Sequence, residues 1–253
     1  MKYVYLLNRF SLKDKLDSLV KRIDQVSKKR KLNYVIEIND LNTSTEDIVE
    51  KYKDKKCILL AVGGDGTINR VLNKVVGTNN MLGFIPYGTG NDFYKTCQET
   101  LKEKVNEIDL IKINEKYFIN VACFGIDAEI GNNDEIIHSK LIPEKQRYNM
   151  SLLLHFIKFK AKRMKVKAKN CNWDEVSTTV VVCNGRYYGG GYKVGYTSEL
   201  QNGVVDLYLI KKVPKLMMAK LIMGMKKGQH EKSSYTTKLQ VKELTIESSE
   251  RAN

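Results

Sequence analysis

A continuous apolar run that ends in a glycine-rich turn and leads directly into a helix constrains the fold of this chain most. Residues Cys57–Val62 form the run, residues 63–67 read Gly-Gly-Asp-Gly-Thr, and apolar residues at helical spacing follow over Thr67–Val76. A strand that is apolar throughout is typical of a parallel sheet with both faces covered. The sequence therefore predicts a strand, a glycine-rich loop at its carboxyl end, and a helix.

The same alternation of strand and helix extends over residues 1–115. It predicts strands at Tyr3–Leu7, Tyr34–Ile38 and Leu82–Ile85, and helices at Lys13–Lys31 and Thr45–Tyr52. Alternation of this kind indicates an α/β domain built on a parallel sheet. The apolar face of the first helix is predicted to contain Leu16, Leu19, Val20, Ile23 and Val26.

Past about residue 108 the pattern changes to strands separated by turns. The change predicts a second, β-rich domain over residues 116–253, and it leaves open whether the last strand returns to the first domain. The predicted elements of this part are strands at Ile108–Ile113, Tyr117–Ala122, Val176–Cys183 and Val204–Ile210, and a helix near Ser151–Lys162.

Two loops of the first domain have the composition of phosphate-binding loops. The first is residues 63–67, and the second, residues 86–93, reads Pro-Tyr-Gly-Thr-Gly-Asn-Asp-Phe and is predicted to end at an N-capping Asn-Asp pair. Glycines let backbone amides approach phosphate oxygens, and a helix N-terminus adds partial positive charge. Both loops follow strands of one parallel sheet, so they are expected at the same edge, where ligands bind. No Walker-type GxxxxGK[ST] sequence occurs.

Asp65 is an unusual residue for such a loop, because a carboxylate repels phosphate. It could bind a magnesium ion, accept a proton from an attacking hydroxyl, or lie one layer behind the phosphates. A plain alternative is a tight turn in which Asp65 caps a helix. The residues alone leave these readings open.

Composition limits the class of protein and its partners. The formal net charge of +14 implies attraction to an anionic partner, which could be a nucleic acid, a nucleotide or an acidic lipid surface. The five cysteines show no CxxC spacing, which argues against a disulfide framework and a zinc site and favours a reducing cytoplasm. No apolar run of about 18 residues occurs, so a soluble protein is expected.

The two loops belong to a set of five motifs: GGDGT at 63–67, PYGTGNDF at 86–93, YFINVACFGIDAEI at 117–130, YYGGGYKVGY at 187–196 and GQH at 228–230. Together they resemble one family, the soluble bacterial diacylglycerol kinases and their sphingosine and ceramide kinase relatives. The GGDGT sequence alone is shared with NAD kinases, whereas the PYGTGNDF sequence is typical of the lipid kinase branch. The resemblance implies an α/β nucleotide domain, a C-terminal β-sandwich domain, and an ATP site in a cleft between them.

The resemblance also implies an activity and a set of site residues. The reaction would be in-line transfer of the γ-phosphoryl group of ATP, bound with Mg²⁺, to a lipid hydroxyl, with diacylglycerol as the expected acceptor. Asp65 would lie near the nucleotide magnesium. The nucleotide contacts carried over from the family are Asn8, Ser11, Gly63, Gly64, Asp65, Gly66, Thr67, Asn69, Gly88, Thr89 and Asn91.

The chain departs from the family pattern at several positions. Arg9 and Arg70 replace a proline and a glutamate beside the expected phosphates. The turn that holds a structural magnesium in the family is altered here, so a metal at Glu199, Asn202 and Val204 is doubtful.

The DGE motif that supplies the family's proposed general base does not appear before Asn253. Either the chain is truncated or it uses another base. Asp65 is the candidate in the second case, and Glu247 and Glu250 are weaker ones.

Two lysine-rich segments, 155–169 and 211–227, could lie on an anionic membrane or could be ordinary solvated surfaces. The leading hypothesis is therefore a cytoplasmic lipid kinase that is peripherally associated with membranes. A homodimer is left open, and no nucleic-acid partner is expected. The alternatives are a catalytically silent family member that binds nucleotide or lipid, an NAD kinase-type enzyme, and a nucleic-acid-binding regulator that only the charge suggests.

Overall fold

The computed structural model describes residues 1–41, 43–125 and 159–248, and these residues divide into two compact units. Unit 1 contains Met1–Leu101 and Leu110–Ile119, whereas unit 2 contains Lys102–Asp109 and the chain from Asn120 onward. The sequence placed the boundary at residues 115 and 116. In the structure the chain passes between the units near residues 101, 109 and 119.

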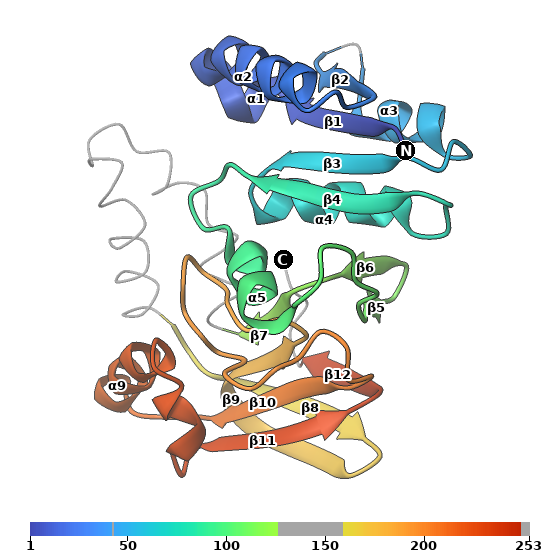
Figure 1. Cartoon of the computed structure of the whole chain (residues 1–253). Helices are drawn as coiled ribbons and strands as arrows, with labels where there is room; N and C mark the ends of the chain where they lie inside the picture. Colours follow the sequence, from blue (N-terminus) through green and yellow to red (C-terminus); the bar gives the residue numbers. More distant parts are fainter. Residues whose placement is uncertain (42, 126–158, 249–253) are drawn as a thin grey trace. The chain divides into compact units, whose positions relative to one another are not determined.

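Unit 1 is an α/β domain whose described residues form a four-stranded parallel sheet of order β2-β1-β3-β4, which confirms the predicted fold class (Figure 1). Helices follow each of these strands, as expected for right-handed βαβ units. The strands are β1 (Tyr3–Asn8), β2 (Tyr34–Asn39), β3 (Ile58–Gly63) and β4 (Met81–Pro86). The helices are α1 (Arg9–Leu12), α2 (Leu16–Lys29), α3 (Thr45–Tyr52), α4 (Asp65–Val75) and α5 (Asp92–Thr100), and a short hairpin contains β5 (Ile111–Ile113) and β6 (Lys116–Phe118).

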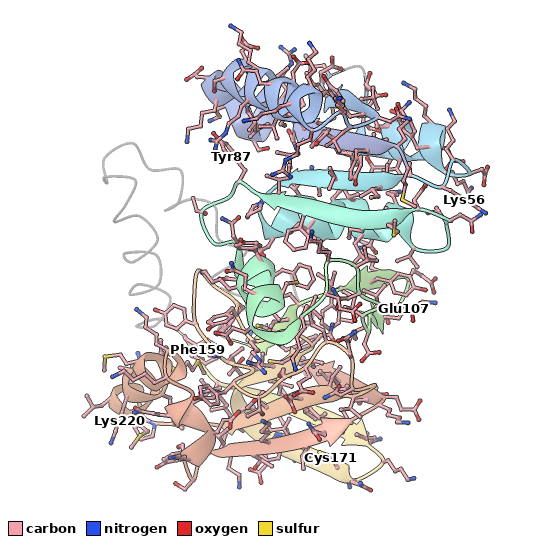
Figure 2. The ribbon with its side chains drawn as sticks, viewed as in Figure 1. Lys56, Tyr87, Glu107, Phe159, Cys171 and Lys220 are labelled. Carbon is pink, nitrogen blue, oxygen red and sulfur yellow. The ribbon has the colours of Figure 1, made fainter. Side chains whose placement is uncertain are left out.

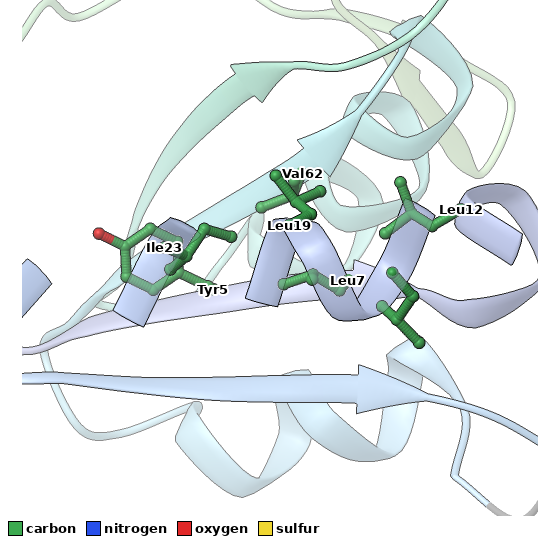
Figure 3. Packing of buried hydrophobic residues seen from close by; sticks show 7 residues of the cluster. Tyr5, Leu7, Leu12, Leu19, Ile23 and Val62 are labelled. Carbon is green, nitrogen blue, oxygen red and sulfur yellow. The ribbon is translucent and has the colours of Figure 1, made fainter. Parts of the chain in front are cut away.

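Part of the core of unit 1 lies between α2 and the sheet. Leu19 and Ile23 of α2 are buried with Tyr5, Leu7 and Val62 in one apolar cluster (Figure 3). The predicted apolar face of α2 was wrong at its end. Val26 is 43% exposed. Ser27 is buried in its place, because its hydroxyl donates a hydrogen bond of 3.0 Å to the Tyr5 hydroxyl.

Unit 2 is built on an antiparallel sheet of order β11-β10-β9-β8-β12, with β7 also paired to β9. The first half of the long strand β9 pairs with β8, and its second half pairs with β7 and β10. The two halves of β9 therefore pair with different strands, as in a β-sandwich, where one long strand can contribute to both sheets. The elements are β7 (Val121–Gly125), β8 (Lys162–Ala168), β9 (Cys171–Cys183), β10 (Val205–Lys211), α9 (Lys215–Met225), β11 (Thr236–Val241) and β12 (Leu244–Ser248).

Three sequence predictions need correction or restriction in this part. The single strand predicted over Tyr117–Ala122 is two strands, because β6 pairs within unit 1 and β7 pairs within unit 2. The last described strand, β12, pairs with β8 and stays in unit 2. The helix predicted near Ser151–Lys162 falls mostly outside the described residues, and β8 already begins at Lys162. No described helix is both long and apolar enough to cross a lipid bilayer.

Candidate functional site

Three loops of unit 1 meet at the carboxyl edge of its parallel sheet. In the sheet register, Leu7 lies opposite Val62, and Gly63 lies opposite Pro86. The Tyr87 N–H donates a hydrogen bond of 2.9 Å to the Gly63 carbonyl, which ties the second loop to the first. The loops after β1, β3 and β4 are therefore neighbours (Figure 1). The two glycine-rich loops lie at one edge of the sheet, as predicted from the parallel strands that precede them.

The two glycine-rich loops pack backbone against backbone at Gly64 and Gly88. A Cβ atom on Gly88 would lie 2.5 Å from the Gly64 Cα, and a Cβ on Gly64 would lie 3.2 Å from the Gly88 Cα. A side chain at position 88 would push the loops apart, whereas one at position 64 would need the backbone at Gly88 to shift by a few tenths of an ångström. The contact between the loops thus requires the glycine at 88 and favours the one at 64, whether or not they also contact a nucleotide.

Gly66 differs from the other glycines of the first loop. A Cβ on Gly63 would lie 2.5 Å from the Thr67 Oγ1, whereas a Cβ on Gly66 would meet nothing within 4 Å. Gly66 lies in the first turn of α4, is exposed and is helical. A glycine inside a helix costs about 0.5–1 kcal/mol relative to alanine. Since packing does not require this glycine, the open space above it is available to a ligand.

The N-terminus of α4 is uncapped by any side chain. Gly64 is the N-cap residue and has no side chain to accept hydrogen bonds from the first turn. The first N–H groups of a helix have no partner inside the helix, and they carry part of the positive end of the helix dipole. This end of α4 therefore suits an anionic group.

Asp65 joins the two loops. Its Oδ2 accepts a hydrogen bond of 3.0 Å from the Asp92 N–H, and its Oδ1 accepts one of 2.8 Å from the Phe93 N–H. Asp65 thus caps α5, the helix of the other loop. The alternative from the sequence was a cap on the helix that follows Asp65 directly, but Gly64 is the N-cap residue of that helix. The roles of Asp65 as base or magnesium ligand stay predictions, and they must be compatible with two backbone N–H groups on its oxygens.

The end of the second loop does not form the expected N-capping Asn-Asp pair. Asn91 is the N-cap residue of α5 but makes no capping hydrogen bond. Its side chain instead accepts a bond of 2.9 Å from the Gly88 N–H and donates one of 2.8 Å to the Gly88 carbonyl. Asn91 adopts a left-handed φ of 50°, which directs its amide back into the loop. Thr89 and Tyr87 are left exposed on the loop (Figure 2).

Asn8 and Ser11 shape the loop after β1. The Asn8 Oδ1 accepts hydrogen bonds from the Phe10 N–H at 2.9 Å and the Ser11 N–H at 3.3 Å. The Ser11 hydroxyl donates to the Asn8 carbonyl at 3.2 Å. The Asn8 amide nitrogen remains a donor at the carboxyl end of β1. Arg9 is exposed in this loop and Arg70 is exposed on α4.

Asn73 is a structural residue of this region that the sequence did not reveal. Its side chain accepts a bond of 2.7 Å from the Tyr117 N–H and donates one of 2.7 Å to the Tyr117 carbonyl. It also donates to the Asn69 carbonyl at 2.9 Å, one helical turn earlier. Asn73 therefore connects α4, which begins at the first loop, to β6. The only sequence signal for this role is that Asn73 is a polar residue next to the apolar positions of α4.

The structure adds no support to the metal sites considered from the sequence. Among the described residues, no group of three or more His, Cys, Asp or Glu side chains lies together. In the altered turn, the Asn202 Oδ1 accepts the Val204 N–H at 3.2 Å, and the Gly203 N–H donates to the Asp109 side chain at 2.7 Å. These contacts test neither a structural metal at Glu199, Asn202 and Val204 nor a magnesium ion beside Asp65.

The structure tests neither of the two weaker base candidates. Glu247 is exposed in β12 of unit 2 and lies opposite Lys165 in the sheet register. Glu250 falls outside the described residues.

Two family models match the chain. The model described as "Diacylglycerol kinase catalytic domain" matches residues 2–120, and the model described as "YegS C-terminal NAD kinase beta sandwich-like domain" matches residues 120–253. The two matches meet where the sequence of unit 1 ends.

Individual relatives and solved structures agree with these matches. A "Probable lipid kinase YegS-like" of Pectobacterium atrosepticum is 26% identical over 69% of this chain, and one of Yersinia enterocolitica is 27% identical over 74%. The matched segments span 62% and 67% of those relatives, and 54% of a Staphylococcus carnosus relative. A crystal structure of a diacylglycerol kinase from Bacillus anthracis str. Sterne has a TM-score of 0.70 and 18% identity, covering 98% of this chain and 86% of its own, which shows a shared fold.

Proposed function

Because this chain belongs to the lipid kinase family defined by the diacylglycerol kinase catalytic domain and the YegS-type β-sandwich domain, we propose that it transfers the γ-phosphoryl group of ATP to a lipid hydroxyl. The expected acceptor is diacylglycerol, which would yield phosphatidic acid. The observation that carries the proposal is the exposed, unexplained Gly66 in the uncapped first turn of α4.

The site supports binding of a polyphosphate through its backbone. The first-turn N–H groups of α4 point out of the helix end at the sheet edge, and no Cβ at Gly66 blocks approach to them. The Asn8 amide, the Thr89 hydroxyl and the Asn69 amide are further donors on the loops and on α4, whereas the Ser11 hydroxyl already donates to the Asn8 carbonyl. Arg9 and Arg70 add exposed positive charge to the same unit.

Transfer at such a site rests on positioning and on charge stabilisation. A phosphoryl transition state spreads negative charge over the equatorial oxygens, so fixed N–H donors stabilise it without rearrangement. Asp65 holds the two loops in register by capping α5, and this keeps the donors of both loops on one ligand. Magnesium is expected to accompany ATP, but the described residues offer no carboxylate set for it, so no step is assigned to the ion.

The test is transfer of radiolabelled γ-phosphate from ATP in mixed micelles that contain diacylglycerol, sphingosine, ceramide and NAD, with the full-length natural protein. Label in phosphatidic acid is expected. It should be lost together with ATP binding in Gly66→Ala, which should raise the free energy of unfolding by about 0.5–1 kcal/mol because the helix gains an alanine. The control is Lys21→Ala on the exposed face of α2.

The other outcomes reject the proposal in distinguishable ways. Label in NADP would identify an NAD kinase-type enzyme. ATP binding without label in any acceptor would support a silent nucleotide-binding protein, a candidate that the commitment of both Asp65 oxygens to α5 favours. Unchanged ATP binding in Gly66→Ala would remove the observation on which the site rests.

The role of Asp65 is separable by the same assays. As the cap of α5, Asp65→Ala should lose about 0.5–2 kcal/mol of unfolding free energy and weaken ATP binding. If Asp65 is also a general base, the same variant should lose transfer even when it is folded and saturated with ATP, so the loss exceeds what weaker ATP binding explains.

A further inference from the structure

Helix α9 of unit 2 is apolar on nearly all sides. Met218, Leu221 and Met225 face inward and belong to one buried cluster with Ile210 and Val213. Yet Leu216 is 86% exposed and Met223 is 69% exposed on the outer side of the same helix. A helix on a solvated surface normally presents polar residues outward. The outer face of α9 is therefore suited to a second, apolar environment.

The charged residues of the segment that contains α9, from Lys211 to Lys227, are all lysines. No Asp or Glu occurs between Asp206 and Glu231, and six lysines do. Leu216, Lys220 and Met223 follow one another at spacings of four and three residues, so they form a single exposed stripe on the helix, and the exposed Lys227 follows just past its end. No ion pair of Lys212, Lys220 or Lys227 occurs in the described part of the chain. The six lysines are Lys211, Lys212, Lys215, Lys220, Lys226 and Lys227.

A hollow beside the start of α9 has the same chemistry as the stripe. It has a volume of about 490 Å³, within the range of pockets that take small ligands. Figure 2 labels two residues of this region, Phe159 at the hollow and Lys220 on the helix. The hollow combines basic and apolar lining from Lys160, Lys212, Lys215, Phe159, Val213 and Met218.

We propose that α9 and this hollow form a docking surface for a lipid bilayer that contains anionic phospholipids. Leu216 and Met223 enter the interface between headgroups and acyl chains, and the lysines meet lipid phosphates, as in interfacial helices with basic flanks. The hollow takes a phosphate next to apolar walls. The proposal goes beyond phosphoryl transfer and does not depend on it.

The combination of lysines and exposed apolar residues favours an anionic bilayer over a second copy of the chain and over a nucleic acid. A second copy of the chain would bring two sets of six lysines together on one interface, which like-charge repulsion opposes. A nucleic acid would use the lysines but would leave Leu216 and Met223 in water. Only a surface that is anionic outside and apolar beneath satisfies both features.

Vesicle co-sedimentation tests the electrostatic part. The full-length protein should bind vesicles of phosphatidylcholine with phosphatidylglycerol, should bind vesicles of phosphatidylcholine alone far more weakly, and should be released by salt. The triple variant Lys212→Gln, Lys220→Gln, Lys227→Gln should bind on the order of 100-fold more weakly. The matched control Lys15→Gln, Lys21→Gln, Lys29→Gln removes the same charge from unit 1. An equal loss in both variants would overturn the proposal.

Insertion is tested with a tryptophan reporter. Trp173 is the sole tryptophan of the sequence, so Trp173→Phe with Leu216→Trp leaves one reporter on α9. Its emission should shift to the blue with anionic vesicles and be quenched by brominated lipid.

Serine substitutions test the same apolar face. The double variant Leu216→Ser with Met223→Ser should weaken vesicle binding. The control Leu41→Ser should not, although Leu41 is 89% exposed in unit 1. An emission that does not shift with anionic vesicles would overturn the proposal. A natural protein that is dimeric, and that becomes monomeric in Leu216→Ser with Met223→Ser, would also overturn it, because a second copy of the chain would then cover this face. ATP binding is unaffected in every variant if each folds.

Discussion

His230 of unit 2 is a buried imidazole with one nitrogen satisfied. It is 1% exposed, and its Nε2 lies 2.9 Å from the Val194 carbonyl oxygen. Its Nδ1 has no hydrogen-bond partner among the described residues. Burial lowers the pKa of His230, because no acceptor stabilises a second ring proton. The neutral form of this histidine is thus part of the folded state.

The buried imidazole predicts a loss of stability in mild acid. The unfolded chain takes up a proton near the ordinary histidine pKa of about 6.5, and the folded chain does so only at lower pH. As pH falls through about 6.5, the unfolded state binds more protons, so the free energy of unfolding decreases. Urea unfolding at about pH 7.5 and about pH 5.5 should show a smaller pH dependence in His230→Leu than in the natural protein. Equal dependence in both would refute this assignment.

Single residues also show where sequence reasoning about the site stops. The loops at residues 63–67 and 86–93 were found from their glycines and from the strands before them. The different roles of those glycines could not be found in this way. Gly64 and Gly88 pack against each other across two loops, and Asp65 caps a helix that begins 27 residues later in the sequence. Such long-range contacts leave no local pattern.

Helix α4 carries the candidate phosphate-binding turn at one end and a fixed connection near its other end. Asn73 is the connection, since its amide makes both hydrogen bonds of the Tyr117 peptide in β6. Removing the amide would leave a backbone N–H and carbonyl without their partner, which typically costs about 1–3 kcal/mol.

Asn73→Ala should therefore lower the free energy of unfolding of unit 1 by about 1–3 kcal/mol, measured by urea denaturation. Asn73→Asp should recover part of the loss, because a carboxylate still accepts from the Tyr117 N–H. The control is Asn106→Ala, whose amide bonds only the nearby Glu103 carbonyl. A loss in Asn106→Ala as large as that in Asn73→Ala would contradict the role of Asn73.

Most elements were predictable because each has a strong local pattern. The apolar runs predicted the parallel strands of unit 1, such as β3 over Ile58–Gly63. The break between β6 and β7 was not predictable in this way. Residues 117–122 are compatible with a strand throughout, and the break arises because their pairing partners lie in different units.

At the scale of the whole molecule, the chain passes between the two units three times. Residues 102–109 belong to unit 2 although they lie between segments of unit 1. Asp109 is the main contact of this segment. It donates through its N–H to the Leu200 carbonyl at 2.7 Å, and it accepts from Asn184 at 2.9 Å and from the Gly203 N–H at 2.7 Å.

A fragment that begins at Asn120 should therefore be less stable than one that begins at Lys102. The shorter fragment lacks the three hydrogen bonds of Asp109, each worth about 0.5–1.5 kcal/mol net. Thermal unfolding by circular dichroism compares the two fragments, and Asp109→Ala in the longer one isolates the side-chain contribution. Equal midpoints for both fragments would show that residues 102–109 do not stabilise unit 2.

The threefold passage also limits how this architecture can be recombined. A hybrid protein that joins unit 1 of one relative to unit 2 of another by a single junction near residue 119 would carry residues 102–109 with the wrong parent. Asp109 would then face a foreign turn at 200–203. The two halves of such a protein are inherited together unless the short segment is exchanged as well, so sequence drift in that segment should follow unit 2.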